Sequence, residues 1–182
     1  MVTSDGEFVE NPKWYRGGQA KLRVLQHTVS RRKKGGVNRR KAVHALQVQH
    51  EYVANQRKDF LNKLANRLVV SNDLIAIEDL RITNRIKNHN LVRSILDGGW
   101  GYFAQRLSDK AVEAGREVVR ANPAYASKTC SGCGTVFENF DLSVRWIKCN
   151  CGLSMNRDVN AVINILKRAL QNRVGQTRWE QA

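Results

Sequence analysis

Four cysteines constrain the fold of this chain more than any other feature of its sequence. They form two close pairs separated by fifteen residues: Cys130 and Cys133, then Cys149 and Cys151. Thiolates in this arrangement suit the tetrahedral coordination that Zn²⁺ prefers, and a glycine after each pair permits a tight turn. The spacing predicts a zinc ribbon over residues 127–155. Its connecting hairpin is expected to be built by apolar residues between the pairs: Phe137, Phe140, Leu142, Val144 and Trp146. Because four thiolates leave no open position for substrate, we expect the zinc to be structural.

Two disulfides, or four unliganded thiols, are the alternatives to a metal site. Disulfides need an oxidising compartment. The sequence has no stretch that resembles a signal peptide and no apolar run near the ~18 residues of a membrane span, which favours the cytoplasm. In that reducing compartment, clustered cysteines usually bind metal. A single residue separates Cys149 from Cys151, so the second turn is expected to be the tighter one.

The chain is strongly basic, with a formal net charge of +15 over 182 residues. The charge is uneven, since residues 1–70 hold fifteen Lys or Arg and five Asp or Glu, a net of +10. Seven cations fall within residues 31–41: Arg31, Arg32, Lys33, Lys34, Arg39, Arg40 and Lys41. Gly35 and Gly36 interrupt any helix here, which predicts two basic helix ends joined by a flexible turn that can follow a phosphate backbone. The overall charge favours nucleic-acid contact over the alternative, a solvated basic loop with no ligand.

Hydrophobic periodicity predicts helices and short strands in alternation. A hairpin is expected over residues 2–10, with a type I′ turn at Asp5-Gly6. Helices are expected at 19–32 and 38–69, and one apolar stripe runs along the second: Leu46, Val53, Phe60, Leu64 and Leu68. Residues 74–78 and 117–121 are typical of short strands; the first has the apolar run of a buried strand, and Pro123 ends the second.

Two further helices are predicted in the second half of the chain. The first spans 99–115, with these residues mostly on one side: Trp100, Phe103, Leu107 and Val112. The last spans 158–171, with these residues inward: Val159, Val162, Ile163, Leu166 and Leu170. The tail from Gly175 is expected to be loose.

Two carboxylates are candidates for catalytic chemistry. Glu78 ends the apolar strand, and carboxyl ends of strands are where α/β sheets usually hold active residues. Asp158 starts the last helix, where the dipole stabilises a negative charge. If the two converge, they can hold Mg²⁺ through oxygen ligands. Taken alone, each has a structural explanation as well: Asp158 as an N-cap, and Glu78 as a strand-end residue paired with an arginine.

Three motifs occur in order along the chain. They are Ile77-Glu78-Asp79-Leu80, then Ser127-Lys-Thr-Cys130-Ser-Gly-Cys133-Gly134 with Cys151-Gly152, then Arg157-Asp158-Val-Asn160-Ala161-Val-Ile-Asn164-Ile165. Together they resemble the C-terminal part of OrfB/TnpB-type transposon proteins, over about residues 3–170. These are RNA-guided DNA nucleases with a RuvC-like, RNase H-fold domain interrupted by a zinc ribbon, and they are similar to type V CRISPR effectors.

The resemblance implies roles for individual residues. Glu78 matches the family's second catalytic carboxylate and Asp158 its third, with magnesium or manganese as the catalytic ion. The basic helical pair matches an insert that lies against the guide–target duplex, which implies DNA and guide-type RNA as partners. The family often has Asp at the position of Asn156, which is not one of its three metal carboxylates.

The resemblance also implies an α/β fold: an incomplete RNase H-like (RuvC) fold with a helical-hairpin insert and an inserted zinc ribbon. Residues 1–18 would be the remnant of the first RuvC hairpin and 19–70 the basic helical insert. Residues 71–126 would form the RuvC-like part with Glu78, and 127–155 the ribbon. Residues 156–182 would form the C-terminal RuvC-like helix with Asp158, and the tail.

The family's first catalytic aspartate precedes the segment that matches residues 3–8, so we expect it to be absent from this chain. Asp5 is a turn residue and does not replace it. The family's N-terminal recognition half is expected to be missing or separate. Two-ion phosphodiester cleavage needs the third carboxylate, so cleavage by this chain alone is expected to be impaired.

Two functions follow as hypotheses. The first is the C-terminal nuclease part of a transposon-associated, RNA-guided DNA endonuclease. The alternative is a non-catalytic zinc-ribbon protein that binds nucleic acid. A ribosome-associated ribbon protein would not explain Glu78 and the Arg-Asp-x-Asn-Ala run.

Overall fold

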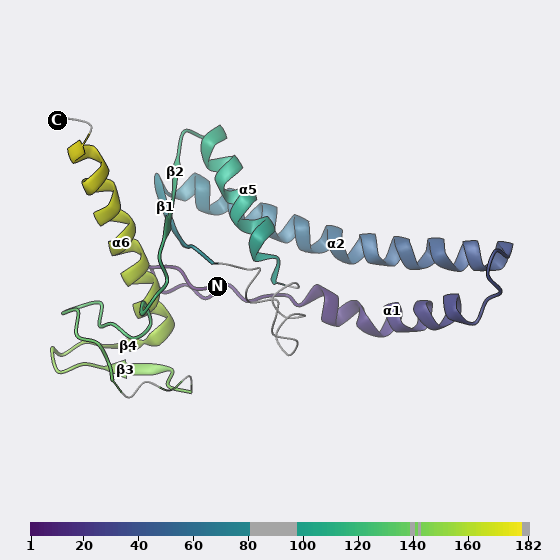
Figure 1. Ribbon diagram of the computed structural model, residues 1–182, viewed down its shortest axis with the longest axis horizontal. Coiled ribbons are helices and arrows are strands. Elements are labelled where there is room, and N and C mark those ends of the chain that lie inside the picture. Colours follow the sequence, from purple (N-terminus) through teal and green to yellow (C-terminus); the bar gives the residue numbers. More distant parts are fainter. Residues whose placement is uncertain (81–97, 139–140, 142, 180–182) are drawn as a thin grey trace. The chain divides into compact units, whose positions relative to one another are not determined.

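A computed structural model describes residues 1–80, 98–138, 141 and 143–179 of the chain. Helices and short strands follow one another in this order (Figure 1): α1 (Trp14–Ser30), α2 (Val37–Ser71), β1 (Leu74–Glu78), α5 (Trp100–Glu113), β2 (Glu117–Ala121), β3 (Trp146–Lys148), β4 (Ser154–Asn156) and α6 (Arg157–Trp179). The chain divides into two compact units, which are described separately. One unit comprises Asn11–Leu68 and Ile82–Lys110, and the other comprises Met1–Glu10, Val69–Arg81 and Ala111–Ala182.

The first unit contains the two long basic helices predicted from periodicity. Helices α1 and α2 lie side by side (Figure 1), and they approach closely at Gly18, where an added Cβ would lie 2.8 Å from Val53 Cγ2. The predicted apolar stripe of α2 turns inward, with Val53 and Leu64 buried and the other three residues half-buried. The break between the helices falls where it was expected, and Gly35 adopts a positive φ of 79° there.

Helix α5 packs on α2 through polar and apolar contacts. The hydroxyl of Tyr102 and the Nε of Arg106 both donate to Asn62 Oδ1, each at 3.2 Å. Phe103 and Leu107 are buried as predicted, but Val112 is 79% exposed. The buried row of this helix advances by four residues at a time, so it continues to Ala111, and Val112 is turned about 100° away from it.

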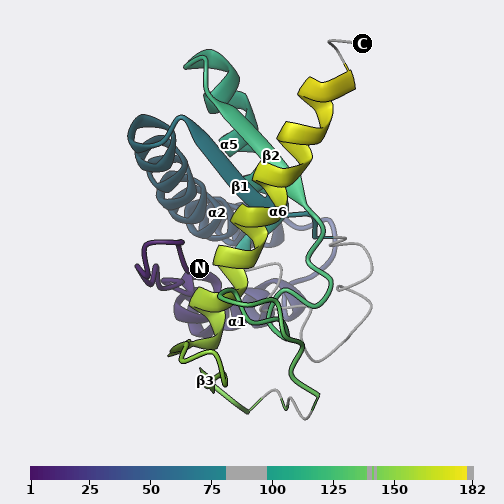
Figure 2. The ribbon, with the colours of Figure 1, turned by 90° about the vertical axis from the view of Figure 1, so that its left-hand side faces the viewer.

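The second unit is built on two parallel strands and one helix. Strands β1 and β2 have the predicted bounds and pair in register from Leu74 with Glu117 to Glu78 with Ala121. Helix α6 crosses them (Figure 2) and closes a small core of buried residues: Ala121, Ala126, Ile165 and Ala169. The strand at 74–78 is half-buried along its whole length, rather than buried as its apolar sequence indicated.

Helix α6 runs antiparallel to both strands. Near its carboxyl end, Arg173 Nε lies 3.3 Å from Glu117 Oε2, at the start of β2. Nearer its amino end, Asn164 Nδ2 donates to the carbonyl of Ala126, beyond the end of β2, at 2.9 Å. The carboxyl ends of β1 and β2 therefore point toward the amino-terminal half of α6.

The prediction for α6 was wrong in its length and in part of its buried face. The helix continues to Trp179, past the residue from which a loose tail was expected. Leu170 is 44% exposed, whereas Asn160 and Asn164 are buried. The apolar stripe was assigned by hydrophobicity alone, and two asparagines on an adjacent face carry the polar contacts described below.

The predicted amino-terminal hairpin is present, but its turn differs from the one expected. Val2 and Phe8 form an antiparallel bridge, and the N–H of Thr3 donates to the carbonyl of Glu7 at 3.0 Å. Gly6 alone takes a positive φ, 84°, whereas a type I′ turn needs two such residues. The loop therefore holds three residues and ends in a glycine bulge. Among the described helices, none is long and apolar enough to cross a membrane.

Candidate metal centre and acidic site

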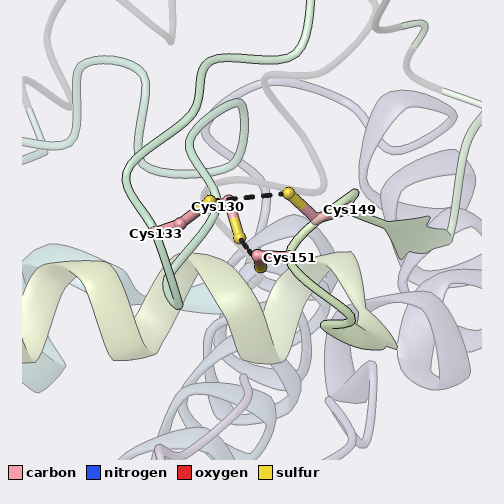
Figure 3. Close-up of side chains that lie close together, drawn as sticks. All are labelled: Cys130, Cys133, Cys149 and Cys151. Carbon is pink, nitrogen blue, oxygen red and sulfur yellow. Dashed lines mark hydrogen bonds between the residues drawn. The ribbon is translucent and has the colours of Figure 1, made fainter.

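The four cysteines come together in the structure (Figure 3). Cys130 Sγ lies 3.7 Å from Cys151 Sγ, and Cys133 Sγ lies 3.6 Å from Cys149 Sγ. All four sulfurs lie within 4.8 Å of one another. Tetrahedral coordination with metal–sulfur bonds of about 2.3 Å requires sulfurs about 3.8 Å apart, whereas a disulfide would bring two of them to about 2 Å. The cysteines are free thiols, and their spacing fits a structural metal ion with four sulfur ligands.

Each cysteine pair occupies the tip of its own small hairpin. The first lies between Thr129 and Val136, which form an antiparallel bridge, and the second lies between β3 and β4. In both tips a glycine with positive φ closes the turn: the N–H of Gly134 donates to the Cys130 carbonyl at 2.9 Å, and that of Gly152 to the Cys149 carbonyl at 3.0 Å.

The two cysteine-bearing hairpins bring the pairs together. Among the described apolar residues between the pairs, Ile147 is buried, Phe137 and Val144 are half-buried, and Trp146 is 58% exposed, so Trp146 does not pack inward as expected. Phe140 and Leu142 lie outside the described residues.

The thiols of the cluster differ in acidity. The Thr135 hydroxyl, 3.2 Å from Cys133 Sγ, and the Thr135 backbone N–H lower the pKa of Cys133 to about 6. At Cys149 a hydrogen bond from the Cys151 backbone lowers the pKa, but desolvation and the neighbouring thiols together raise it to about 12. Thiols this close share protons, and a divalent metal displaces them because the thiolate is the ligand.

The first cysteine hairpin is fastened to α6 by side chains that sequence reasoning had not assigned a role. Asn160 and Asn164 point into the segment before and around Cys130, and Lys167 Nζ donates to the carbonyl of Ser131. The signal in the sequence was the spacing of the polar residues 160, 164 and 167, which places them on one face of a helix. That face was overlooked because buried faces were sought among apolar residues only.

Asp158 lies in the first turn of α6, but it is not the cap of the helix. Asn156 is the cap, since its Oδ1 accepts the Asp158 backbone N–H at 2.8 Å. The Asp158 carboxylate is 43% exposed and is flanked by two arginines, Arg157 Nε at 3.4 Å and Arg145 Nη1 at 3.9 Å. The capping explanation for Asp158 is thus wrong, and the carboxylate is left available at the surface of the helix end.

Glu78 is the last residue of β1 and is half-buried. Because α6 runs antiparallel to the strands, the carboxyl end of β1 and the amino-terminal half of α6 belong to the same end of this unit. Within the described residues, the cysteine cluster is the one group of three or more metal-ligating side chains. Glu78 and Asp158 therefore form no such group with a third ligating side chain in the part of the chain that the structure describes.

The seven cations of the basic block lie in the other unit, at the turn between α1 and α2. Four of them, Arg31 to Lys34, follow the end of α1 and form the turn, and Arg39, Arg40 and Lys41 lie near the start of α2. Six are exposed and Arg39 is half-buried. None of the seven forms an ion pair within the described ranges. Their charge is thus open to solvent and to anionic partners.

Comparison with known proteins supports the family that the motifs suggested. A family model described as "Probable transposase" (OrfB_IS605) matches residues 1–89, and a second, "Cas12f1-like, TNB domain", matches residues 100–165. A Streptomyces pristinaespiralis protein named as a candidate RNA-guided DNA endonuclease is 42% identical over 93% of this chain. The chain is a TnpB-type protein. The Escherichia coli K12 protein InsQ, also named as a candidate RNA-guided DNA endonuclease, is 34% identical over 90% of it.

Solved structures show the same fold for this TnpB-type chain. A protein chain in a Cas12f1–sgRNA–target DNA complex matches 84% of this chain with a TM-score of 0.60 at 22% identity, and the match covers 40% of the Cas12f1 chain. A chain in a CRISPR–Cas12f ternary complex also matches 84% of this chain, with a TM-score of 0.61 at 23% identity, and the match covers 32% of that chain. The chain spans 42% and 44% of the length of the Streptomyces and Escherichia relatives.

Proposed function

We propose that this chain is the nuclease part of a transposon-associated, RNA-guided DNA endonuclease. Its fold would be that of an RNase H-like (RuvC) domain with an inserted zinc ribbon and a basic helical insert. The observation that supports this most is the antiparallel run of α6 along β1 and β2, with Asp158 at the helix start and Glu78 at the strand end. The names of the Streptomyces and Escherichia relatives support the same activity.

In this proposal, Glu78 and Asp158 hold a magnesium or manganese ion. Such an ion would polarise the scissile phosphate and activate a water molecule. The residues of the chain supply the rest: Asn156 fixes the helix start, and Arg157 and Arg145 flank the Asp158 carboxylate. Two carboxylates bind a divalent ion loosely, so we expect little cleavage by the chain alone.

The remaining elements serve binding in this proposal. The cysteine cluster would hold a structural zinc ion, and a reducing compartment such as the cytoplasm would keep its thiols free to bind the metal. The basic block at the turn between α1 and α2 would lie against the backbone of DNA or guide-type RNA. The net charge of +15 supports a polyanionic partner.

Cleavage of labelled DNA with Mn²⁺ or Mg²⁺ tests the proposal. We expect the chain alone to nick DNA feebly, and the chain extended by an upstream strand that bears an acidic residue to nick it readily. In the extended protein, Glu78→Gln and Asp158→Asn should each abolish cleavage, because each removes a metal ligand. Asp59→Asn, which removes an exposed carboxylate paired with Lys63, is the matched control and should leave cleavage unchanged. Activity that survives both Glu78→Gln and Asp158→Asn would place the site elsewhere.

A non-catalytic, zinc-containing nucleic-acid-binding protein is the second candidate. It is favoured by the lack of any group of three ligating carboxylates within the described residues, and by the arginines around the Asp158 carboxylate. This function predicts salt-sensitive binding to nucleic acid with no cleavage, even after the upstream strand is added. The two candidates therefore differ in the outcome of one experiment.

A further inference from the structure

The side chain of Asn160 forms hydrogen bonds with the backbone on both sides of Cys130, one of the four clustered cysteines. Its side chain is fully buried, with 0% exposure, and both ends of its amide are used. The Oδ1 accepts the Ser131 backbone N–H at 2.8 Å, and the Nδ2 donates to the Thr129 carbonyl at 2.7 Å. Thr129 and Ser131 are the two neighbours of Cys130. Both hydrogen bonds of the amide therefore depend on the backbone conformation around Cys130.

The next two turns of α6 continue the same attachment. Asn164 Nδ2 donates to the Thr129 carbonyl at 2.7 Å and to the Ala126 carbonyl at 2.9 Å. Lys167 Nζ donates to the Ser131 carbonyl. Residues 160, 164 and 167 share one helical face, so segment 126–131 is held along three turns of the helix. Hydrogen bonds of this kind are directional, and they fix both the rotation and the axial position of the helix end.

The conformation of segment 126–131 depends on the metal site. Cys130 is 1% exposed, and its sulfur faces Cys151 across 3.7 Å with no covalent bond between them. A bound metal ion would join these sulfurs and hold the hairpin closed, whereas loss of the ion would leave thiols with no tie between the two cysteine hairpins. Any shift of Thr129 or Ser131 would then break the bonds to the Asn160 amide.

Asp158 precedes Asn160 by two residues, which is about 200° around an α-helix. The carboxylate and the amide therefore leave the helix on opposite sides: Asn160 toward the cysteine hairpin, and Asp158 away from it. A rigid turn of helix connects them, so the placement of one determines the placement of the other.

We propose that Asn160, assisted by Asn164, is a positioning residue that makes metal binding at the four cysteines hold the first turn of α6, and with it Asp158, in place. The consequence for catalysis rests on the proposed function, but the coupling between metal site and helix does not. Coupling of this kind is reciprocal: if the metal orders the helix end, the Asn160 contacts must strengthen metal binding by the same factor.

Amide hydrogen exchange of the full chain, with zinc bound and after chelation, tests the coupling. In the natural chain, removing zinc should speed exchange over residues 157–161 by about tenfold or more, since buried hydrogen bonds are lost. Asn160→Asp keeps the size and the acceptor but loses the donor to Thr129. The zinc-loaded variant should exchange over 157–161 as the zinc-free natural chain does, and zinc should dissociate from it about tenfold faster. Asn164→Asp, which retains the Asn160 amide, should give an intermediate result.

Asn172→Asp is the matched control, because it makes the same change at an exposed position of the same helix. It should leave exchange and zinc dissociation as in the natural chain. Protection of β1 and β2 serves as the internal reference for an intact fold. Unchanged exchange over 157–161 after zinc removal, or a normal zinc response in both Asn160→Asp and Asn164→Asp, would overturn the proposal. Amide exchange and zinc dissociation are measured without nucleic acid. A failed cleavage experiment would therefore not contradict the coupling, and absence of the coupling would not contradict the proposed nuclease function.

Discussion

At the scale of single residues, hydrogen bonds from the backbone and from small side chains set the chemistry of both candidate sites. Thr135 lowers the pKa of Cys133 through its hydroxyl and its N–H. Asn156 caps α6 by accepting the Asp158 backbone N–H, so the Asp158 carboxylate does not serve as the helix cap. Thr135 and Asn156 are not candidate metal ligands, yet each acts on the side chain of a residue that is one.

The first prediction at this scale concerns zinc affinity and pH. Metal binding displaces thiol protons, so affinity should fall as pH falls. Cys133, whose pKa is lowered to about 6, is mostly deprotonated at neutral pH and takes up its proton only as pH drops through that value. The slope of log Kd against pH should therefore steepen by about one proton below pH ~6. Competition with a chromophoric chelator between pH 5 and 8 measures it.

The Thr135→Val variant is the control for this effect. It removes the hydroxyl but keeps a β-branched side chain, so the Cys133 pKa should rise and the break in slope should move to higher pH. A break that stays at the same pH in the variant would show that Thr135 does not set the acidity of this thiol.

The second residue-scale prediction concerns the helix cap. Asn156→Ala should lower the free energy of unfolding by about 1 kcal/mol, the usual effect of losing an N-cap. Asn156→Asp should leave it nearly unchanged, because aspartate is an equally good cap, and this agrees with the aspartate that the family often has at this position. Urea denaturation followed by circular dichroism measures both. Equal effects of the two substitutions would argue against a capping role.

At the scale of elements, close packing between neighbouring pieces decides which sequence positions tolerate change. The two glycines near the start of α1 illustrate this. A Cβ on Gly17 would meet nothing within 4 Å, whereas one on Gly18 would meet Val53 of α2 at 2.8 Å. The packing of α1 on α2 therefore requires glycine at position 18 but not at position 17.

This difference gives a paired prediction. Gly17→Ala should raise the free energy of unfolding by about 0.5–1 kcal/mol, since alanine is more stable than glycine in the interior of a helix. Gly18→Ala gains the same helix propensity but forces α1 away from a stiff, β-branched neighbour, so its net effect should be destabilising. Thermal or urea unfolding of the two variants compares them directly. Stabilisation of similar size by both would mean that α1 and α2 do not pack at Gly18.

At the scale of the whole molecule, charge is the dominant property. The excess of cations is concentrated in residues 1–70, and the described structure leaves the basic block at the α1–α2 turn unpaired. Screening by salt acts on such exposed charge much more than on buried contacts. The strength of nucleic-acid binding should therefore depend on ionic strength.

The prediction at this scale is quantitative. Each cation that neutralises a phosphate contributes about 0.9 to the slope of log K against log salt for duplex DNA, and about 0.7 for single strands. The double variant Lys33→Gln/Lys34→Gln should lower the slope by about 1.8 for duplex DNA if both lysines contact phosphates. Fluorescence anisotropy of labelled DNA across a salt series measures the slope.

The double variant Lys58→Gln/Lys63→Gln removes the same charge from exposed positions of α2, about 25 Å or more along the helix from the block. It should change the slope less. An equal change would indicate diffuse attraction by net charge, and no change in either variant would refute the assignment of the basic block as a contact surface.

The sequence by itself determined those features that depend on short-range chemistry. Cysteine and glycine spacing located the metal centre, apolar runs gave β1 and β2 at their observed bounds, and Gly35 marked the break between the basic helices. Each of these is decided by residues close together in the chain, where turn geometry and periodicity act directly.

Only the tertiary structure decided what the polar face of α6 does. Asn160 and Asn164 are buried because segment 126–131 provides carbonyl and N–H partners for their side chains. The sequence of the helix alone does not predict which distant segment will provide them. The same holds for Val112 and Leu170, apolar residues left exposed because none of the described elements covers their side of the helix. Burial is a property of the neighbours that a residue meets, and those neighbours come from distant parts of the chain.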